Sequence, residues 1–420
     1  DDLFSKITSF YSRQNYEELA SYLRSKSKLL KDQHTKLEQL YNAFQGPEAT
    51  LVQISIFKKR LTTLTQVSMN EWEKWLQRIS TFLINFDPLQ AQFNKKTFCG
   101  LCFKYAHYSF ELGVNYPEFA NRAFCSLLNA YHRIGLYGKV TPIHTALCKL
   151  ALKTKQISAV RSVIEEHYLN INAQETGIKA EQAILFFYYA GSIATVLKKY
   201  DIAAHFFELG ITTPSQAVHA ASIECYKKLV LINIIATGNA YSQPKYVSSP
   251  VQKMINTLCG HYNKLANTFH DILVDQQIPE ALTKIITEAG ALWSTDSNYG
   301  LVKQAQKALI KHKIKRLTKT YVTLSFADIS AATDLRDCEE MLANMIIEGE
   351  LNAKIDQEHK MIIFEEKDNQ LNIDDLETDC HTLLNQLREV ENMIEVVSLD
   401  PRYARSALPQ LEKKSSSIMA

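Results

Sequence analysis

Residues 321–330, "YVTLSFADIS", and residues 339–366, "EEMLANMIIEGELNAKIDQEHKMIIFEE", decide how this chain folds. The first stretch opens with β-branched and aromatic residues, which predict a strand, and continues into a short helix. The second begins with an apolar helical stripe that Gly349 is suited to end, because glycine adopts positive φ freely. Alternating apolar residues, a polar turn and a returning apolar run then predict a β-hairpin. This order of elements predicts a winged helix with a three-stranded sheet.

Upstream, residues 1–300 predict helix after helix, because apolar residues recur at a spacing of three to four. A weak repeat is fullest in "FFYYAGSIATVLKKYDIAAHFFELGITTP". There Gly191, Ala203 and Phe207 have the spacing of the two small positions and the large position of a tetratricopeptide-like helix pair. The related pairs are Ala120 with Phe124 and Ala159 with Val163. Each helix pair can bury its apolar face only against its neighbours, so we expect a right-handed helical-repeat solenoid.

Composition agrees with a mostly α protein. A length of 420 residues favours several domains or a repeat array, and the low content of glycine (13) and proline (10) favours helix over sheet. The eight cysteines are scattered and no secretory leader is visible, which predicts free thiols in the cytoplasm and nucleus. The longest apolar runs are far shorter than the roughly 20 residues that cross a bilayer. We therefore expect a soluble intracellular protein.

A Gly-, Pro- and Ser-containing stretch at 237–250 predicts a loop within the helical region. The chain as a whole is expected to divide into four segments, the second of them in two parts. These are N-terminal helical repeats at 1–180, a second domain at 181–366 with a helical part at 181–320 and a winged helix at 321–366, a long C-terminal helix at 367–399, and a flexible tail at 400–420.

The C-terminal helix carries an unbroken heptad seam. Its apolar positions step alternately by three and four residues: Ile373, Leu376, Cys380, Leu383, Leu387, Val390, Ile394 and Val397. The seam follows the last globular element and must bury against something outside it. A bundle with the C-terminal helices of other chains is the more economical interpretation, and packing back on the chain's own solenoid is the alternative. The expected bundle contacts are Leu376, Leu383, Leu387, Val390 and Ile394.

Signatures of catalytic and cofactor sites are missing from the sequence. It has no dinucleotide or phosphate-loop glycine pattern, no H-E-x-x-H or H-x-H pair and no G-x-S-x-G elbow. Cys99 and Cys102 form a C-x-x-C pair, but no second pair follows at zinc-site spacing, so we expect two small apolar residues on one helix face. The sequence predicts no enzyme activity, no cofactor and no metal.

Charge argues against DNA reading by the winged helix. Residues 328–400 contain 20 acidic residues against 5 basic ones, a net charge of −15. The charged residues of the helix that would enter a major groove are Arg336, Asp337, Glu339, Glu340 and Glu348. DNA affinity depends on neutralising phosphates with Lys and Arg, and this surface would repel them.

A protein-binding role remains for the winged helix. The edges of a three-stranded sheet carry unpaired backbone donors and acceptors that a partner can extend. The candidate edge contacts are Tyr321, Val322, Thr323, Leu351, Ala353 and Ile355. The alternative is that these edges are short and solvated.

Just before the winged helix, seven basic residues lie between Lys303 and Lys319, and no acidic residue occurs between Asp296 and Asp328. The candidate basic contacts are Lys311, Lys313, Lys315 and Arg316. Two interpretations are equally open: a solvated helix face, or a contact with the acidic lobe of another subunit.

Helical repeats that lead into "YVTLSFADIS…MLANMIIEGELNAKIDQEHKMIIF" resemble the PCI-domain family. PCI domains are shared by the proteasome lid, the COP-9 signalosome and the third eukaryotic translation initiation factor. Three stretches resemble the signalosome subunit-three family in particular: "KYDIAAHFFELGITTPSQAVHAASIECYKKLVLINIIATG", the "QPKY" after it, and "NYGLVKQAQKALIKHKIKRLTKTYVTLSFADIS". The resemblance is dense over 185–365 and loose before residue 180.

This resemblance implies a non-catalytic scaffold subunit of a complex that removes a ubiquitin-like modifier from cullins and so regulates cullin–RING ubiquitin ligases. The implied partners are the other PCI subunits and the zinc isopeptidase-containing subunits, with cullin–RING ligases as further candidates. It also implies that winged helices associate side by side and that C-terminal helices gather in a bundle. A PCI subunit of the proteasome lid or of the initiation factor is the alternative. A nucleic-acid adaptor that uses the basic helix is a third hypothesis.

Overall fold

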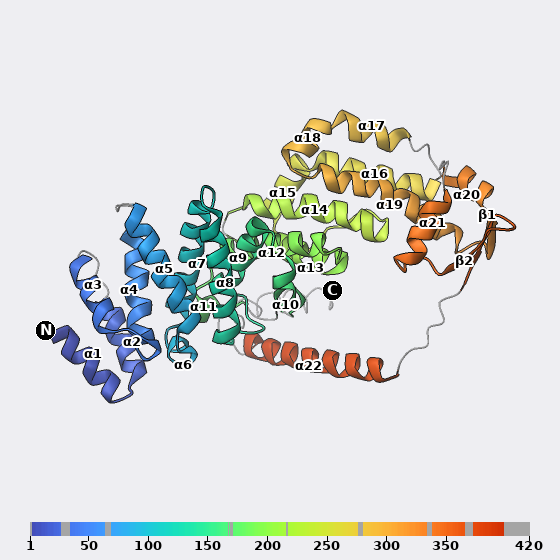
Figure 1. The fold of residues 1–420 in the computed structure, drawn as a ribbon. Coiled ribbons are helices and arrows are strands. Elements are labelled where there is room, and N and C mark those ends of the chain that lie inside the picture. The colour runs from blue at the N-terminus through green and yellow to red at the C-terminus, as the bar shows by residue number, and fades with distance from the viewer. Residues whose placement is uncertain are drawn as a thin grey trace, which may run out of the picture. The chain divides into compact units, whose positions relative to one another are not determined.

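The computed structural model describes residues 2–26, 34–63, 69–166, 168, 171–215, 217–275, 280–333, 338–365 and 373–398 (Figure 1). The chain forms two compact units that divide between Leu317 and Thr318. The described part of the first unit is helical, and the second unit contains a three-stranded sheet. The expectation of a mostly α fold with a small sheet is confirmed. The predicted tail at 400–420 lies outside the described residues.

The first unit begins with helices that belong to the predicted repeats. They are α1 (Asp2–Ser12), α2 (Tyr16–Ser25), α3 (His34–Ala43), η2 (Pro47–Ala49), α4 (Thr50–Thr63), α5 (Met69–Asn85), α6 (Pro88–Gln92), α7 (Lys95–Leu112), α8 (Pro117–Ile134), α9 (Pro142–Thr154), η4 (Ser158–Val160), α10 (Arg161–Glu165) and α11 (Ala173–Thr176). The remaining helices of the unit are α12 (Ala180–Val196), α13 (Tyr200–Thr212), α14 (Ala220–Thr237), α15 (Ser249–Leu258), α16 (Gly260–Asp275), α17 (Glu280–Glu288), α18 (Gly290–Thr295) and α19 (Tyr299–Leu317).

Helices of the first unit pack mainly on their neighbours in the chain, as a solenoid requires. α7 packs on α8 and α9, α9 on α12, α12 on α13, and α13 on α14 (Figure 1). Because α9 packs directly on α12, the helical stack continues across residue 180. The predicted loop at 237–250 falls between α14 and α15. The boundary at 180/181 stays a prediction.

Two helices approach each other closely at the predicted small–small–large triplet. A Cβ built on Gly191 of α12 would lie 2.7 Å from the Phe207 ring of α13. Gly191, Ala203 and Phe207 are all buried. The glycine therefore makes room for the ring, and this detail of the sequence prediction is confirmed.

The copy of the repeat at Ala159 was predicted wrongly. Ala159 lies in the 3₁₀ helix η4 and is exposed, while Val160 and Val163 are buried. The 3₁₀ helix ends at Val160 and α10 begins at Arg161, so Ala159 and Val163 lie in different helices and do not share one α-helical face. The pair Ala120 and Phe124, by contrast, is buried in α8.

Cys99 and Cys102 lie in α7 and are fully buried among apolar side chains. Burial raises the pKa of the Cys99 thiol to about 12. A thiol with so high a pKa stays protonated at neutral pH. Both cysteines are core residues, as expected.

The second unit contains a winged helix and one long helix. Its elements are β1 (Thr323–Ser325), α20 (Phe326–Thr333), α21 (Cys338–Ile347), β2 (Ala353–Asp356), β3 (Met361–Phe364) and α22 (Ile373–Ser398). The strand order is β1-β3-β2 with antiparallel pairing, and Ile329, Leu342, Met345 and Ile362 form the core of the lobe. Gly349 has φ +71° just after α21, as the sequence predicted for a helix-ending glycine.

Candidate functional site

The strand order leaves β1 and β2 as the two edges of the winged-helix sheet. On either side of β1, Val322 O accepts a hydrogen bond from Phe364 N at 2.8 Å, and Phe326 N donates to Lys360 O at 3.0 Å. In an antiparallel pair the bonded residues alternate with residues whose backbone groups point the other way. The N–H and C=O groups of Thr323 and Ser325 therefore point away from the sheet.

The other edge behaves similarly but offers less side-chain surface. Glu365 N donates to Asn352 O at 2.9 Å, so the same alternation turns the backbone groups of Ala353 and Ile355 outward. The side chains of Leu351 and Ala353 are only 6% and 8% exposed. On this edge, Ala353 can offer a partner its backbone but not its side chain. Leu351 offers neither its side chain nor its backbone N–H, because that N–H donates to Met345 O at 3.2 Å.

The outward face of the sheet carries apolar side chains. Val322 is 72% exposed, but it hydrogen-bonds with Phe364 and so lies at the end of the opposite, inward face. On the outward face, Tyr321 is 48% exposed and Ile363 of the central strand is 40% exposed. Ile363 is paired in register with Thr323, so the two share this face. The sequence prediction missed Ile363, although the period of two in "MIIF" separates it from the inward Ile362 and Phe364.

In the winged helix, α21 is the helix that would read DNA, and it exposes acidic side chains to solvent. Glu339 and Glu340 are exposed in the first turn of α21. Acidic residues in that position stabilise the helix through its dipole. They also repel a phosphate backbone, which agrees with the expectation from charge.

The heptad seam of α22 is exposed. Leu376, Leu383, Leu387, Val390 and Ile394 are between 41% and 62% exposed. Leu384, which the sequence analysis did not select, is 52% exposed and lies next to Leu383, which widens the apolar stripe. The side chains of Ile373 and Val397 lie outside the described residues. The five predicted bundle residues therefore share one accessible helix.

The predicted basic contacts lie near the end of α19. Arg316 is exposed, whereas Lys311, Lys313 and Lys315 are half-buried. Ile314, between two of these lysines, is fully buried in the helix packing. Their role as a partner contact stays a prediction.

A buried polar network fixes the turn between α18 and α19, in the "NYGLVKQ" segment. Asn298 is fully buried; its Nδ2 donates to Tyr262 Oη at 2.9 Å and its Oδ1 accepts from Lys228 Nζ at 2.6 Å. Tyr262 Oη in turn donates to Asp296 Oδ2 at 2.8 Å, and Lys227 Nζ donates to Asp296 Oδ1 at 2.8 Å. Side chains from α14, α16 and the α18–α19 turn are thereby joined.

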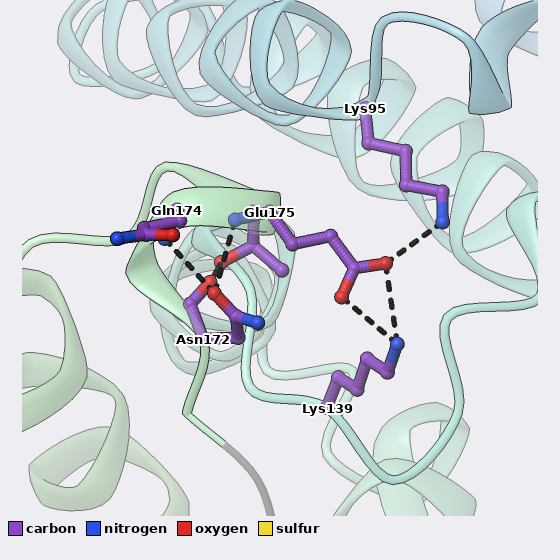
Figure 2. Close-up of polar contacts among 6 residues, drawn as sticks. Lys95, Lys139, Asn172, Gln174 and Glu175 are labelled. Carbon is purple, nitrogen blue, oxygen red and sulfur yellow. Dashed lines mark hydrogen bonds and ion pairs between the residues drawn. The ribbon is translucent and has the colours of Figure 1, made fainter. Parts of the chain in front are cut away.

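A second polar cluster joins distant parts of the repeats (Figure 2). Glu175 of α11 accepts from Lys95 Nζ of α7 at 2.8 Å and from Lys139 Nζ at 2.9 Å. Asn172 Oδ1 caps α11 by accepting from the backbone N–H groups of Gln174 and Glu175. Hydrogen bonds from Lys95 and then Lys139 hold the pKa of Glu175 below its usual value.

Within the described ranges, no group of three or more His, Cys, Asp or Glu side chains is arranged to hold a metal ion. Across the same part of the chain, none of the helices has the length and apolar character that a membrane span needs.

A helical-repeat unit followed by a winged helix with two open sheet edges defines a PCI-type protein. The PCI-domain profile matches residues 268–366. A second profile, COP9 signalosome complex subunit 3, N-terminal helical repeats, matches residues 13–251. The chain therefore belongs to the COP9 signalosome subunit 3 family.

Two curated relatives carry the same family description. A Drosophila melanogaster protein named COP9 signalosome complex subunit 3 is 31% identical over 292 residues, covering 64% of this chain and 64% of that protein. A Dictyostelium discoideum protein of the same name is 30% identical over 272 residues, covering 63% of this chain and 64% of that protein. The chain thus spans about 64% of the length of the curated relatives it matches.

Proposed function

We propose that this chain is a non-catalytic scaffold subunit of the COP9 signalosome. The complex removes a ubiquitin-like modifier from cullins and thereby regulates cullin–RING ubiquitin ligases. Family membership supports this proposal over the proteasome-lid and initiation-factor alternatives, since the repeat profile is specific to signalosome subunit 3. The proposed partners are the other PCI subunits and the zinc isopeptidase-containing subunits, and the proposed compartments are the cytoplasm and nucleus.

One observation carries the proposal: an exposed, regular apolar seam on a 26-residue helix. Fully burying one Leu or Ile side chain stabilises a contact by roughly 1.5–3 kcal/mol. The five seam residues together therefore offer enough burial to hold a helix in a bundle. Acidic Glu377 and Glu391 flank the seam, so partner helices with basic flanks fit it best.

The two open edges of the winged helix support lateral contacts with other PCI subunits. We assign these contacts to the backbone of Thr323 on β1 and of Ala353 and Ile355 on β2, with the side chains of Tyr321 and Val322 beside the first edge. A partner strand added to either edge would bond backbone groups that now point outward.

The test introduces Leu383→Asp together with Leu387→Asp in a tagged chain expressed in cells. Burying a carboxylate in an apolar bundle is strongly unfavourable, so we expect the variant to leave the complex. The matched control is Asn385→Asp with Asn392→Asp, which adds the same charge on the opposite face of α22. The control should co-purify with the same subunits as the unaltered chain.

The measurement is the native mass and subunit inventory of the purified assembly. Recovery of several PCI subunits with a zinc isopeptidase that cleaves modified cullin is the expected result for the unaltered chain. Stoichiometric recovery of the Leu383/Leu387 variant would contradict the bundle role. Proteasome or ribosomal partners would contradict the assignment to the signalosome.

A further inference from the structure

Basic side chains from helices far apart in sequence gather where α4 packs on α2 and α7. Lys58 and Lys59 lie on α4, Lys96 and Lys104 lie on α7, and Arg24 lies on α2. Burial, followed by the charges of Lys59, Lys104, Lys96 and Arg24, lowers the pKa of Lys58. Lys104 has a lowered pKa for the same two kinds of reason. These cations are near enough to repel one another.

The cluster has an open track along α7. Lys96, Gly100 and Lys104 are four residues apart in turn, so they share one face of the helix over two turns, about 12 Å. A Cβ built on Gly100 would meet nothing within 4 Å, so a side chain at this position between the two lysines would enter open space. A Cβ at Gly177 would lie 2.6 Å from Lys96 Cγ, so the stem of Lys96 rests against the Gly177 backbone.

Three members of the cluster lack the ion pairs that neighbouring lysines have. Lys95, next to Lys96, pairs with Glu175, which also pairs with Lys139 (Figure 2). Lys58, Lys96 and Lys104 form no ion pair with any other residue that the structure describes. Mutual repulsion with no local counter-charge is relieved when an anionic group binds.

We propose that this lysine cluster, Lys58, Lys96 and Lys104, binds an acidic peptide segment, a short run of Asp and Glu residues from a partner protein. Two separated lysines along a track of about 12 Å match about four residues of extended chain at roughly 3.3 Å each. Each ammonium can then pair with its own carboxylate. Solenoid surfaces bind extended segments in this manner. Tight phosphate recognition, by contrast, favours arginine forks, and the one arginine here, Arg24, donates a bond to Phe93 O at 3.2 Å.

The test uses a fluorescein-labelled peptide of five Glu-Asp repeats and the full chain, with binding measured by fluorescence anisotropy at 50 and 200 mM salt. We expect binding that weakens with salt, because exposed charges are screened. Lys96→Glu with Lys104→Glu should weaken binding by about ten-fold, which is about 1.4 kcal/mol. The matched control is Lys303→Glu with Lys307→Glu, which makes the same charge change on exposed lysines of α19 and should retain affinity within about two-fold.

A second variant tests the track without changing charge. Gly100→Leu places a side chain in the open space between the two lysines and should also weaken binding, while the urea midpoint shows that the fold is kept. The proposal is overturned if the unaltered chain does not bind the peptide at 50 mM salt, or if the α19 variant loses affinity instead. It is also overturned if polyphosphate or single-stranded RNA of matched charge binds about ten-fold more tightly through the same lysines. This binding is measured on the chain alone and does not depend on the proposed complex.

Discussion

Replacing Asn298 with alanine tests whether the buried polar network holds the α18–α19 turn. The variant loses a hydrogen bond to Tyr262 Oη and one to the Lys228 ammonium. A neutral hydrogen bond contributes about 1 kcal/mol and one to a charged group about 1.5–3 kcal/mol. Lys228 is half-buried, so the lower part of that range applies, and we expect the free energy of unfolding to fall by about 3 kcal/mol.

The assay is urea unfolding followed by tryptophan fluorescence. Trp293 reports on this region because it is fully buried and packs edge-on against Tyr262, with ring centroids 4.8 Å apart. For a slope of about 3 kcal/mol per molar urea, the expected loss lowers the midpoint by about 1 M. Asn121→Ala is the control, because Asn121 is exposed and its hydrogen bond with Gln156 lies at the surface. An Asn298→Ala midpoint no lower than that of Asn121→Ala would refute the reasoning.

Three further outcomes are expected. Gly191→Ala should lower the free energy of unfolding by about 1–3 kcal/mol, since its Cβ would overlap the Phe207 ring; an unchanged urea midpoint would contradict the close approach. Gly349→Ala should cost about 1 kcal/mol, because alanine is strained at φ +71°, and thermal unfolding of the winged helix would show it. Glu175→Gln should be less stable than the unaltered chain at pH 7. Because the folded pKa of Glu175 is lowered, its contribution to the free energy of unfolding is full above its unfolded pKa of about 4.5 and is lost as the pH falls through the folded pKa. The melting temperatures of the variant and the unaltered chain should therefore converge in acid; divergence would contradict the reasoning.

Local patterns predicted much of the fold. The winged-helix order, the glycine after α21 and the Gly191–Phe207 contact all follow from spacing within one or two neighbouring elements. The prediction for Ala159 was wrong because spacing alone does not distinguish a 3₁₀ turn from an α-helix. Leu351 and Ala353 were selected as contacts because alternation shows which residues share a face. Alternation does not show which of the two faces is buried. That depends on the pairing with β3 and on the helices that pack beneath the sheet.

The polar clusters could not be predicted because they join residues distant in the chain. Glu175 is 80 residues from Lys95 and 36 residues from Lys139. The lysine cluster around α4 and α7 has the same origin, since each of its members is unremarkable in its own helix. Only the packing of α4 on α7 reveals that Lys58 lies near Lys96 and Lys104.

The strand order of the winged helix also limits how such lobes can be joined. β1 and β2 are different edges on opposite sides of β3, so a lobe that uses both edges has two unlike neighbours. Contacts between unlike surfaces are heterologous, and they generate a row with a direction instead of a two-fold pair. Nothing in a single lobe sets the length of such a row. The number of subunits would then be decided at its ends, by a member whose outer edge is blocked.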